Sequence, residues 1–404
     1  MRLTRGTGPA RQATIREHNL SMVLDEVLRA DEPISRAGLA AATGLTRATV
    51  SALVDELVAS GLVAESGRSQ SGTAGRPSIG LVASPHGPVG IGLEVNVDYL
   101  AVAAVDLAGQ LCYEAVVTAD QRGVPPKEAL GHAEGLVVDA VTALAAADRT
   151  ATRVALAVPG LVEDHLVRVA PNLDWHDVPI PDTIVGLPLI VDNDANLAAQ
   201  GELAAALNRE RGSPVSRSFL YVSGEIGIGA GVVLDGVLMR GAMGFAGEVG
   251  HVAVHPDGPR CGCGAYGCLE QYAGQDAIVR AALMPVTGQT RGTIADVVEL
   301  ARAGEANVIG TLQDAGAALG VVLAGAVNVL DITTIVLGGV VFAPLAPWLA
   351  PAVQRELDAR VLAARWSAPH IRASALGERS TVRGAAEMAL DAVRHFPARF
   401  IGAR

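Results

Sequence analysis

Four side chains that commonly bind metals lie in one short segment of the chain. His251 is followed by Cys261, Cys263 and Cys268, so three of the four cysteines fall within eight residues, which is metal spacing rather than a disulfide framework. One imidazole and three thiolates suit tetrahedral Zn2+, and four protein ligands leave no position for an activated water. The spacing predicts a structural zinc site, with unligated or redox-active cysteines as the alternative.

A second polar cluster, Asp-Asn-Asp-Ala-Asn at residues 192–196, follows an apolar stretch that predicts a strand. Adjacent amide and carboxylate groups at the carboxyl end of a strand can hydrogen-bond several hydroxyl groups of a polyol. The same residue types also cap helices, and an Ala-rich segment that favours a helix comes next. The cluster alone leaves the polyol site and the helix cap equally open.

Both clusters lie in a long segment where short apolar strands alternate with Ala-rich helices. From Val89 onward this pattern predicts an α/β body. Residues 317–330 and 332–337 are apolar but interrupted by Asn328 and Asp331. This interruption predicts a buried helix that runs into a buried strand, and not a membrane span.

The first 84 residues have a different pattern. Residues 14–30 predict a helix with one apolar face. Ser35 and Thr46 then stand as N-caps of two short helices, which are joined by a turn at Gly44. Two short helices with such a turn are typical of a helix-turn-helix.

A wing is predicted after these helices, with strands at 62–63 and 79–82 and a polar loop at 65–77. The loop holds Arg76, which Pro77 keeps extended, and such an arginine suits the minor groove of DNA. A flexible Gly/Ser linker is the alternative for the loop alone.

The third predicted helix buries residues at helical spacing and leaves its first turns outward, as a recognition helix does. Asp55 and Glu56 further along would be repelled by phosphates, so only those first turns are expected in the groove. The predicted DNA-binding residues are Ser35, Thr46, Arg47, Thr49, Ser51, Arg68 and Arg76.

Charge is distributed unevenly along the chain, whose net charge is -11. Residues 1–84 hold nine arginines against eight acidic residues, and the rest holds 22 basic against 34 acidic residues. A near-neutral head on an acidic body is compatible with a DNA-binding module on an effector domain. The Arg-bearing first twenty residues have no apolar signal-peptide core, so we expect a cytoplasmic protein with no membrane role.

In this order, the features resemble the ROK family of repressors and sugar kinases over nearly the whole chain. The head is similar to that of sugar-responsive repressors of the xylose and N-acetylglucosamine type. The matching parts of the body, besides the cysteine cluster, are residues 157–160, 170–175, 193–194, 247–251, 328–331, 335–339 and 384–386.

The resemblance implies a winged helix-turn-helix (α+β) followed by the α/β two-lobed, actin-like and ribonuclease-H-like ATPase fold. We expect a DNA-binding head at residues 1–84 and a small lobe at 88–200. The C-terminal helix 380–395 would complete the small lobe, and residues 201–379 would form a large lobe with the zinc loop.

The resemblance also implies a sugar pocket. The family's sugar-binding positions match Asn193, Asp194, Glu248, His251 and Glu270, and Asp194 matches the kinases' catalytic base. Further pocket candidates are Gly160 and Asn172. His251 would bind zinc through one ring nitrogen and face a sugar hydroxyl with the other.

The nucleotide side departs from the family's kinases. Their Asp-x-Gly-Gly-Thr turn aligns with residues 94–98, where both glycines are replaced and Asp98 stands for the threonine. The loop at 223–231 has Ile226 where kinases place a hydroxyl, and residues 338–340 lack the last glycine. A carboxylate at about 4 Å from a phosphate costs on the order of 1 kcal/mol in water. We therefore expect a binding protein and not an enzyme.

The sequence thus predicts a homodimeric or tetrameric repressor of carbohydrate genes that binds operator DNA and a sugar or sugar-phosphate effector, with structural Zn2+ as its only cofactor. Lobe closure around the ligand would change the spacing of two winged heads on a palindromic operator. The alternative is an ATP-dependent sugar kinase with an appended DNA-binding domain, because Asp194 is present. A third hypothesis, that the head binds protein, rests on its low net charge.

Overall fold

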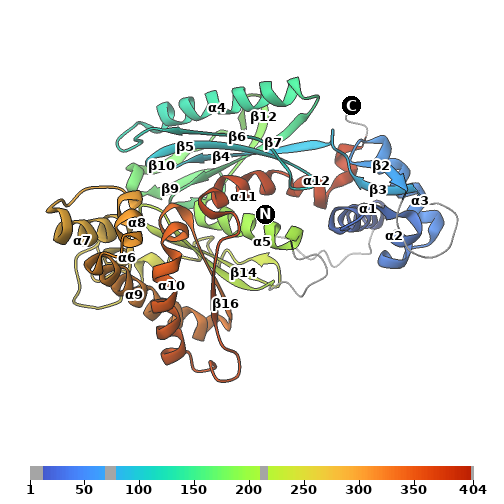
Figure 1. The fold of residues 1–404 in the computed structure, drawn as a ribbon. Coiled ribbons are helices and arrows are strands. Elements are labelled where there is room, and N and C mark those ends of the chain that lie inside the picture. The colour runs from blue at the N-terminus through green and yellow to red at the C-terminus, as the bar shows by residue number, and fades with distance from the viewer. Residues whose placement is uncertain (1–11, 69–78, 210–216, 402–404) are drawn as a thin grey trace.

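The computed structural model describes residues 12–68, 79–209 and 217–401. A small helical head lies at one end of the molecule, and two β-sheets with helices between and around them form the rest (Figure 1). The last helix of the chain, α12 (Asp391–His395), lies beside the head, so the chain runs back towards its first helices (Figure 1).

The head contains the predicted helix-turn-helix. Its elements are α1 (Gln12–Arg29), β1 (Ile34–Ser35), α2 (Arg36–Thr43), α3 (Arg47–Ala59), β2 (Val63–Arg68) and β3 (Ile79–Ala83). Ser35 Oγ accepts the N–H of Gly38, and Thr46 Oγ1 accepts that of Thr49, so both predicted N-caps are confirmed. Gly44 has a left-handed backbone, with φ 71°, and the chain bends by 116° between α2 and α3.

The wing differs from its prediction in two ways. The first strand continues to Arg68 instead of ending near Val63, because residues 63–68 pair with β3. A third strand, β1, adds to the other side of β3, giving the order β1-β3-β2. This two-residue strand carries no pattern of its own, so only the tertiary pairing reveals it. The Gly-Arg-Pro tip with Arg76 lies outside the described residues.

The next sheet has six strands in the order β11-β12-β7-β4-β5-β6. Its strands are β4 (Pro88–Val95), β5 (Tyr99–Asp106), β6 (Leu111–Thr118), β7 (Thr150–Val158), β11 (Thr183–Ile184) and β12 (Leu187–Asn193). Helix α4 (Pro126–Ala146) covers one face, and its buried residues Val137 and Leu144 join the core of this lobe (Figure 1). A small sheet of β8 (Leu161–Glu163), β9 (Leu166–Ala170) and β10 (Trp175–Pro179) lies between β7 and β12 in the chain.

The last sheet has five strands in the order β15-β14-β13-β16-β17. They are β13 (Phe219–Gly224), β14 (Ile228–Leu234), β15 (Val237–Leu238), β16 (Thr334–Gly338) and β17 (His370–Ala373). The helices of this lobe are α6 (Glu270–Ala273), α7 (Gln275–Thr287), α8 (Ile294–Arg302), α9 (Ala306–Leu330) and α10 (Gly339–Arg360). In both large sheets the first strand pairs antiparallel with the second and parallel with the fourth. The same topology is therefore used twice.

Two helices lie between the lobes, α5 (Asp194–Arg209) and α11 (Ser380–Ala389) (Figure 1). They cross at two glycines: a Cβ on Gly384 would lie 1.7 Å from the carbonyl oxygen of Leu197, and one on Gly201 would lie 2.8 Å from Gly384 Cα. Helix α11 also rests on β4, where a Cβ on Gly92 would lie 2.0 Å from the carbonyl oxygen of Val382. Glycines thus allow α11 to pack directly against two elements of the body.

The predicted C-terminal helix is broken at Leu390 into α11 and α12 (Asp391–His395), and α12 is followed by a 3-10 turn at Pro397–Phe400. These last elements pack on the head: Ser21 Oγ in α1 donates to the carbonyl oxygen of Arg394 at 2.8 Å. Leu20 and Leu24 of α1 share one hydrophobic cluster with Leu390 and with Val105 of β5. Head and body are therefore joined by a continuous core.

Two helices in the described residues, α4 and α9, are long and apolar enough to cross a membrane, and the bent pair α2 and α3 would make a third if it counted as one span. Within the fold α9 packs in the core of the large lobe, where Leu319 and Leu323 are fully buried. It ends at Leu330 and buried strand β16 starts at Thr334, as the interrupted apolar stretch predicted.

Candidate metal centre and ligand pocket

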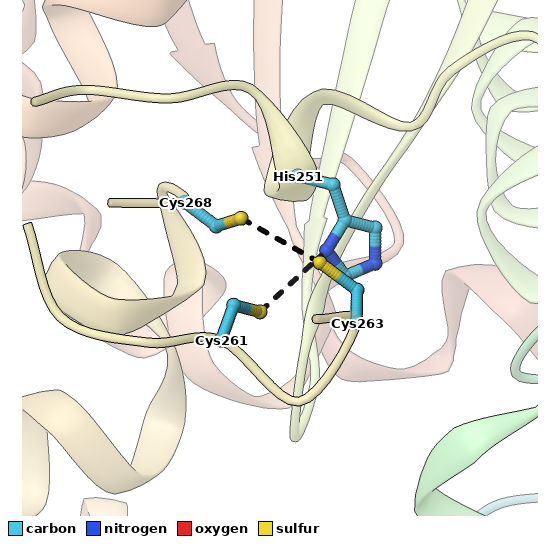
Figure 2. A group of neighbouring side chains, drawn as sticks. All are labelled: His251, Cys261, Cys263 and Cys268. Carbon is cyan, nitrogen blue, oxygen red and sulfur yellow. Dashed lines mark hydrogen bonds between the residues drawn. The ribbon is translucent and has the colours of Figure 1, made fainter. Parts of the chain in front are cut away.

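The four predicted metal ligands converge at one point. His251 ends a short 3-10 turn, Val249–His251, and the three cysteines come from the loop that follows (Figure 2). Their ligand atoms all lie within 4.8 Å of one another. The loop is held by its own backbone, because Cys261 N donates to the carbonyl oxygen of Ala265 at 2.8 Å and Ala253 pairs with Cys268.

The geometry of this cluster fits a tetrahedral metal. Cys263 Sγ lies 3.7 Å from Cys268 Sγ, and Cys261 Sγ lies 3.9 Å from His251 Nδ1. Four ligands on a zinc ion with bonds of about 2.3 Å would place their sulfur atoms about 3.8 Å apart. Nδ1 of His251 faces the cysteines, so Nε2 is left for the pocket, where Glu248 Oε2 lies 4.0 Å away.

A cavity of about 640 Å³ opens beside the metal centre, between the two lobes. All the residues proposed for sugar binding line it: Gly160, Asn172, Asn193, Asp194, Glu248, His251 and Glu270. Asn193 ends β12 and Asp194 begins α5, Gly160 and Asn172 lie beside the small sheet, and the other three belong to the large-lobe segment that carries the predicted metal ligands. The tertiary structure therefore brings together positions that are far apart in the sequence.

The Asn-Asp cluster caps a helix, as one of the two interpretations predicted, and it also lines the cavity. Asn193 Oδ1 accepts the N–H of Asn196 and so caps α5, while its Nδ2 donates to the carbonyl oxygen of Gly160 at 3.0 Å. Asp194 Oδ1 accepts the N–H of Ala195 at 2.7 Å. Its carboxylate lines the cavity, and burial, with the nearby Glu248 charge, raises the pKa of Asp194 to about 7.

Glu270 begins α6 and is fixed by the backbone of the opposite loop. Its Oε1 accepts the N–H of Ile228 at 3.0 Å. Gly227 leaves room for this carboxylate, because a Cβ there would lie 2.3 Å from Glu270 Oε1. Glu270 Oε2 lies 4.0 Å from His251 Nδ1, so this carboxylate links the metal centre to the cavity.

The cavity is also lined by residues that the sequence analysis did not single out, Asn96, Ser223 and Glu225. Glu225 belongs to the loop at residues 223–231, and no feature of the neighbouring sequence indicates that it lies opposite Asn96. The carboxylate expected near the phosphates, Asp98, instead forms an ion pair with Arg122 at 2.6 Å and does not line the cavity. That expectation was therefore wrong about Asp98.

The predicted recognition surface is partly used for capping. Ser35 and Thr46 hold their helix ends through their hydroxyl oxygens, and Thr49 Oγ1 lies 2.9 Å from Thr46 Oγ1. Arg47 is exposed in the first turn of α3, and Ser51 is half-buried one turn later. Arg68 is the last residue of β2.

The acidic residues further along α3 have partners within the head. Arg36 in α2 pairs with Asp55 at 2.7 Å and with Glu65 at 3.1 Å, and Arg16 in α1 pairs with Glu56. These ion pairs reduce the repulsion of DNA phosphates that Asp55 and Glu56 would otherwise cause.

Comparisons with known proteins agree with this architecture. The model of the ROK family matches residues 90–392, and that of the MarR family matches residues 21–72. The xylose repressor of Bacillus subtilis is 28% identical over 392 residues, which cover 95% of this chain and 97% of that protein.

Two solved structures resemble the chain. A ROK family transcriptional regulator, described as a homolog of the E. coli MLC protein, has a TM-score of 0.78 at 24% identity and covers 96% of this chain and 99% of its own. A ROK family glucokinase from Streptomyces griseus, in complex with glucose and AMPPNP, has a TM-score of 0.63 at 26% identity and covers 74% of this chain and 98% of its own. The predicted winged head and two-lobed fold are confirmed, and because the family model spans the chain from β4 to α12, this protein belongs to the ROK family.

Proposed function

We propose that the chain is a sugar-responsive, DNA-binding transcriptional regulator, most simply a repressor of carbohydrate genes. The observation that carries the proposal is the continuous core between a helix-turn-helix head and a body that holds a polar cavity. Relatives named xylose repressor support it over nearly the full chain. The head would be residues 1–84, the small lobe 88–200 with 380–395, and the large lobe 201–379.

The ligand would be a sugar bound through its hydroxyl groups. Carboxylates accept hydrogen bonds from hydroxyls, and the cavity offers those of Asp194, Glu248 and Glu270. Asn172 and the remaining N–H of Asn193 can serve hydroxyl oxygens. Gly160 shapes the floor, because its φ is 154° and a Cβ there would lie 2.2 Å from the carbonyl oxygen of Val169.

Zinc would be held by His251, Cys261, Cys263 and Cys268, where it would cross-link the loop and do no chemistry. Because all four positions would be protein ligands, its effect would be to fix His251 and Glu270 in the wall of the cavity. The sugar site would then depend on the metal through the orientation of these two side chains.

Operator DNA would be bound by the first turns of α3 and by the wing. The residues that would approach base edges and phosphates are Arg47, Thr49 and Ser51. Ser35 and Thr46, at the N-termini of their helices, would lie near the phosphate backbone of the DNA. Arg68 and Arg76 would reach the DNA from the wing. A palindromic operator would need two heads, so we infer a homodimer or a tetramer, acting in the cytoplasm.

Helix α11 would carry the signal from the cavity to the head. Its first residue, Ser380, hydrogen-bonds Tyr221 of β13 in the large lobe, and its body packs on β4 of the small lobe. Its last turn leads through Leu390 into α12, which contacts α1. Lobe closure around a sugar would therefore shift α11 and, with it, the two heads.

The specific observation that favours the alternative, a sugar kinase, is Asp194. Its pKa of about 7 suits a general base, which deprotonates a hydroxyl group. We favour binding without phosphorylation because the cavity holds Ile226, where the resemblance places a hydroxyl in the kinases, and next to it the carboxyl group of Glu225. Sugar-dependent ATP hydrolysis by the purified protein would overturn this choice.

Three variants test the regulator directly. The zinc-loaded protein selects its operator from a random DNA library, and fluorescence anisotropy then measures its affinity with and without a panel of sugars. Asp194→Asn should lose the response to sugar but still bind DNA. Arg47→Ala should bind DNA about tenfold or more weakly, with a smaller salt dependence, and still bind the sugar. Operator binding that is unaltered in both Arg47→Ala and Arg76→Ala would contradict the proposed surface and favour a protein-binding head.

A further inference from the structure

The turn between β13 and β14 directs a carboxylate into the molecule. Glu225 follows the last residue of β13 and is only 6% exposed. Its side chain lines the cavity together with Asn96 and Ser223. The carboxylate faces elements of both lobes.

The contacts of Glu225 are those that a bound anion would make. Its Oε1 accepts the N–H of Val340 at 3.3 Å, in the first turn of α10. Its Oε2 accepts Nδ2 of Asn96 from the small lobe at 3.2 Å. Gly339, with φ 78°, makes room for the carboxylate, because a Cβ there would lie 2.7 Å from Glu225 Oε1.

Helix α10 begins at Gly339, directly beside the carboxyl group of Glu225. The helix has 22 residues, its N-cap is Gly338, and no side chain caps it through that residue. Free N–H groups and the helix dipole make such an end a binding place for phosphate or carboxylate groups. Here the carboxyl group of the protein itself fills that place, so an incoming phosphate would have to displace it.

The other charged residues of the cavity also disfavour a bound phosphate group. Its charged walls are the acids Asp194, Glu225, Glu248 and Glu270, and no Lys or Arg is among the described residues that line it. Burial, with Glu94 and Asp194 nearby, raises the pKa of Glu225, so these surroundings disfavour negative charge even on the protein's own carboxyl group, and a bound phosphate would be disfavoured for the same reason. Arg379 is near enough to lower the pKa of Glu94 but does not line the cavity.

We propose that the carboxyl group of Glu225 occupies the anion-binding place at the N-terminus of α10 and that the cavity therefore takes an unphosphorylated sugar and rejects sugar phosphates and nucleotides. This inference rests on the proposed function and names its ligand class. Sugar hydroxyls donate hydrogen bonds to carboxylates, whereas a phosphate group meets only repulsion from them.

The experiment is isothermal titration of the full-length, zinc-loaded protein. Monosaccharides and their own phosphate esters are titrated as matched pairs, followed by ATP and inorganic phosphate. We expect a free sugar to bind and its ester to bind at least about tenfold more weakly. An ester that binds as tightly as its free sugar would overturn the inference.

Substitutions at Glu225 separate the two parts of the proposal. Glu225→Gly removes the internal carboxylate and should bind ATP or inorganic phosphate about tenfold or more tightly than the native protein does. Glu225→Gln keeps the volume of the side chain without an ionisable group. Its affinity for ATP or phosphate should lie between those of the native protein and Glu225→Gly. Glu305→Gln, the same charge change at an exposed site before α9, should behave like the native protein. Thermal melts establish that each variant is folded.

The outcomes distinguish this inference from the proposed function. If no sugar and no ester binds, the sugar site itself is wrong, and titration of Glu225→Gly with phosphate still decides whether Glu225 blocks an anion site. If sugars bind and Glu225→Gly and Glu225→Gln both reject phosphate as the native protein does, Glu225 is not the blocking group.

Discussion

The guanidinium of Arg394 lies 2.5 Å from the carboxylate of Glu387, at the place where the last two helices of the chain meet α1 of the head. Both side chains are mostly buried, with 20% and 11% exposed. The backbone carbonyl of Arg394 also accepts the hydrogen bond from Ser21. This ion pair therefore lies on the path that we propose for the signal between the cavity and the head.

Arg394→Met should weaken both stability and signalling. The change leaves Glu387 without its partner in a mostly buried site, which costs about 2–4 kcal/mol. Urea unfolding measures this loss, and Arg302→Met, at an exposed position in α8, should change stability by less than about 0.5 kcal/mol. The variant should also bind DNA with a reduced response to sugar. A normal response would show that the signal takes another route.

The free energy of unfolding should depend on pH through the ionisation of Asp194. Burial raises its pKa from 3.8 to about 7, so the folded state binds a proton more tightly than the unfolded chain does. This contribution to stability is fully present below about pH 4 and is lost as the pH rises towards and through 7.

Asp194→Asn removes this titration and should be more stable than the native protein at pH 8, by about 2–4 kcal/mol. The gain should shrink as the pH falls to 6. Urea unfolding of both zinc-loaded proteins at each pH gives the difference, in which effects of pH on the metal ligands cancel. An equal difference at pH 6 and pH 8 would contradict the shifted pKa.

The cysteine cluster should hold one zinc ion in each chain, as elemental analysis of the purified protein would show. Cys268→Ser removes a ligand and should lose most of the metal and lower the melting temperature, because metal binding and folding of the loop are coupled. Cys112→Ser, at the cysteine outside the cluster, should keep its zinc. Native protein without zinc, or Cys268→Ser with a full zinc content, would be evidence against the site.

The crossing of α5 and α11 should tolerate no side chain at Gly384. A Cβ there would lie 1.7 Å from the carbonyl oxygen of Leu197, so Gly384→Ala must push the helices apart and should cost about 2 kcal/mol or more. Gly325→Ala offers a matched control, since a Cβ at that exposed position in α9 meets nothing within 4 Å. It should stabilise the protein by about 0.5–1 kcal/mol, as expected for a helix interior. Equal melting temperatures of the two variants would mean that the crossing is looser than described.

Much of the fold follows from short-range signals. Ser35 and Thr46 cap their helices through N–H groups three residues away, so the sequence places both helix starts correctly. The head's first strand, at residues 34–35, was missed because its only reason to exist is its pairing with β3. The break at Leu390 was also missed, since the contacts of α12 with the head require it and no proline or glycine marks it.

The sequence by itself predicted the cluster of one histidine and three cysteines, the helix-turn-helix and the family. These depend on residues that are close in the chain, where spacing alone fixes geometry, or on motifs that occur in order. Only the tertiary structure decided that Glu225 faces Asn96, 129 residues away, and that Ser21 bonds to Arg394, 373 residues away. Such contacts arise when independently formed elements pack together, and the sequence between them leaves no trace of which pairs will meet.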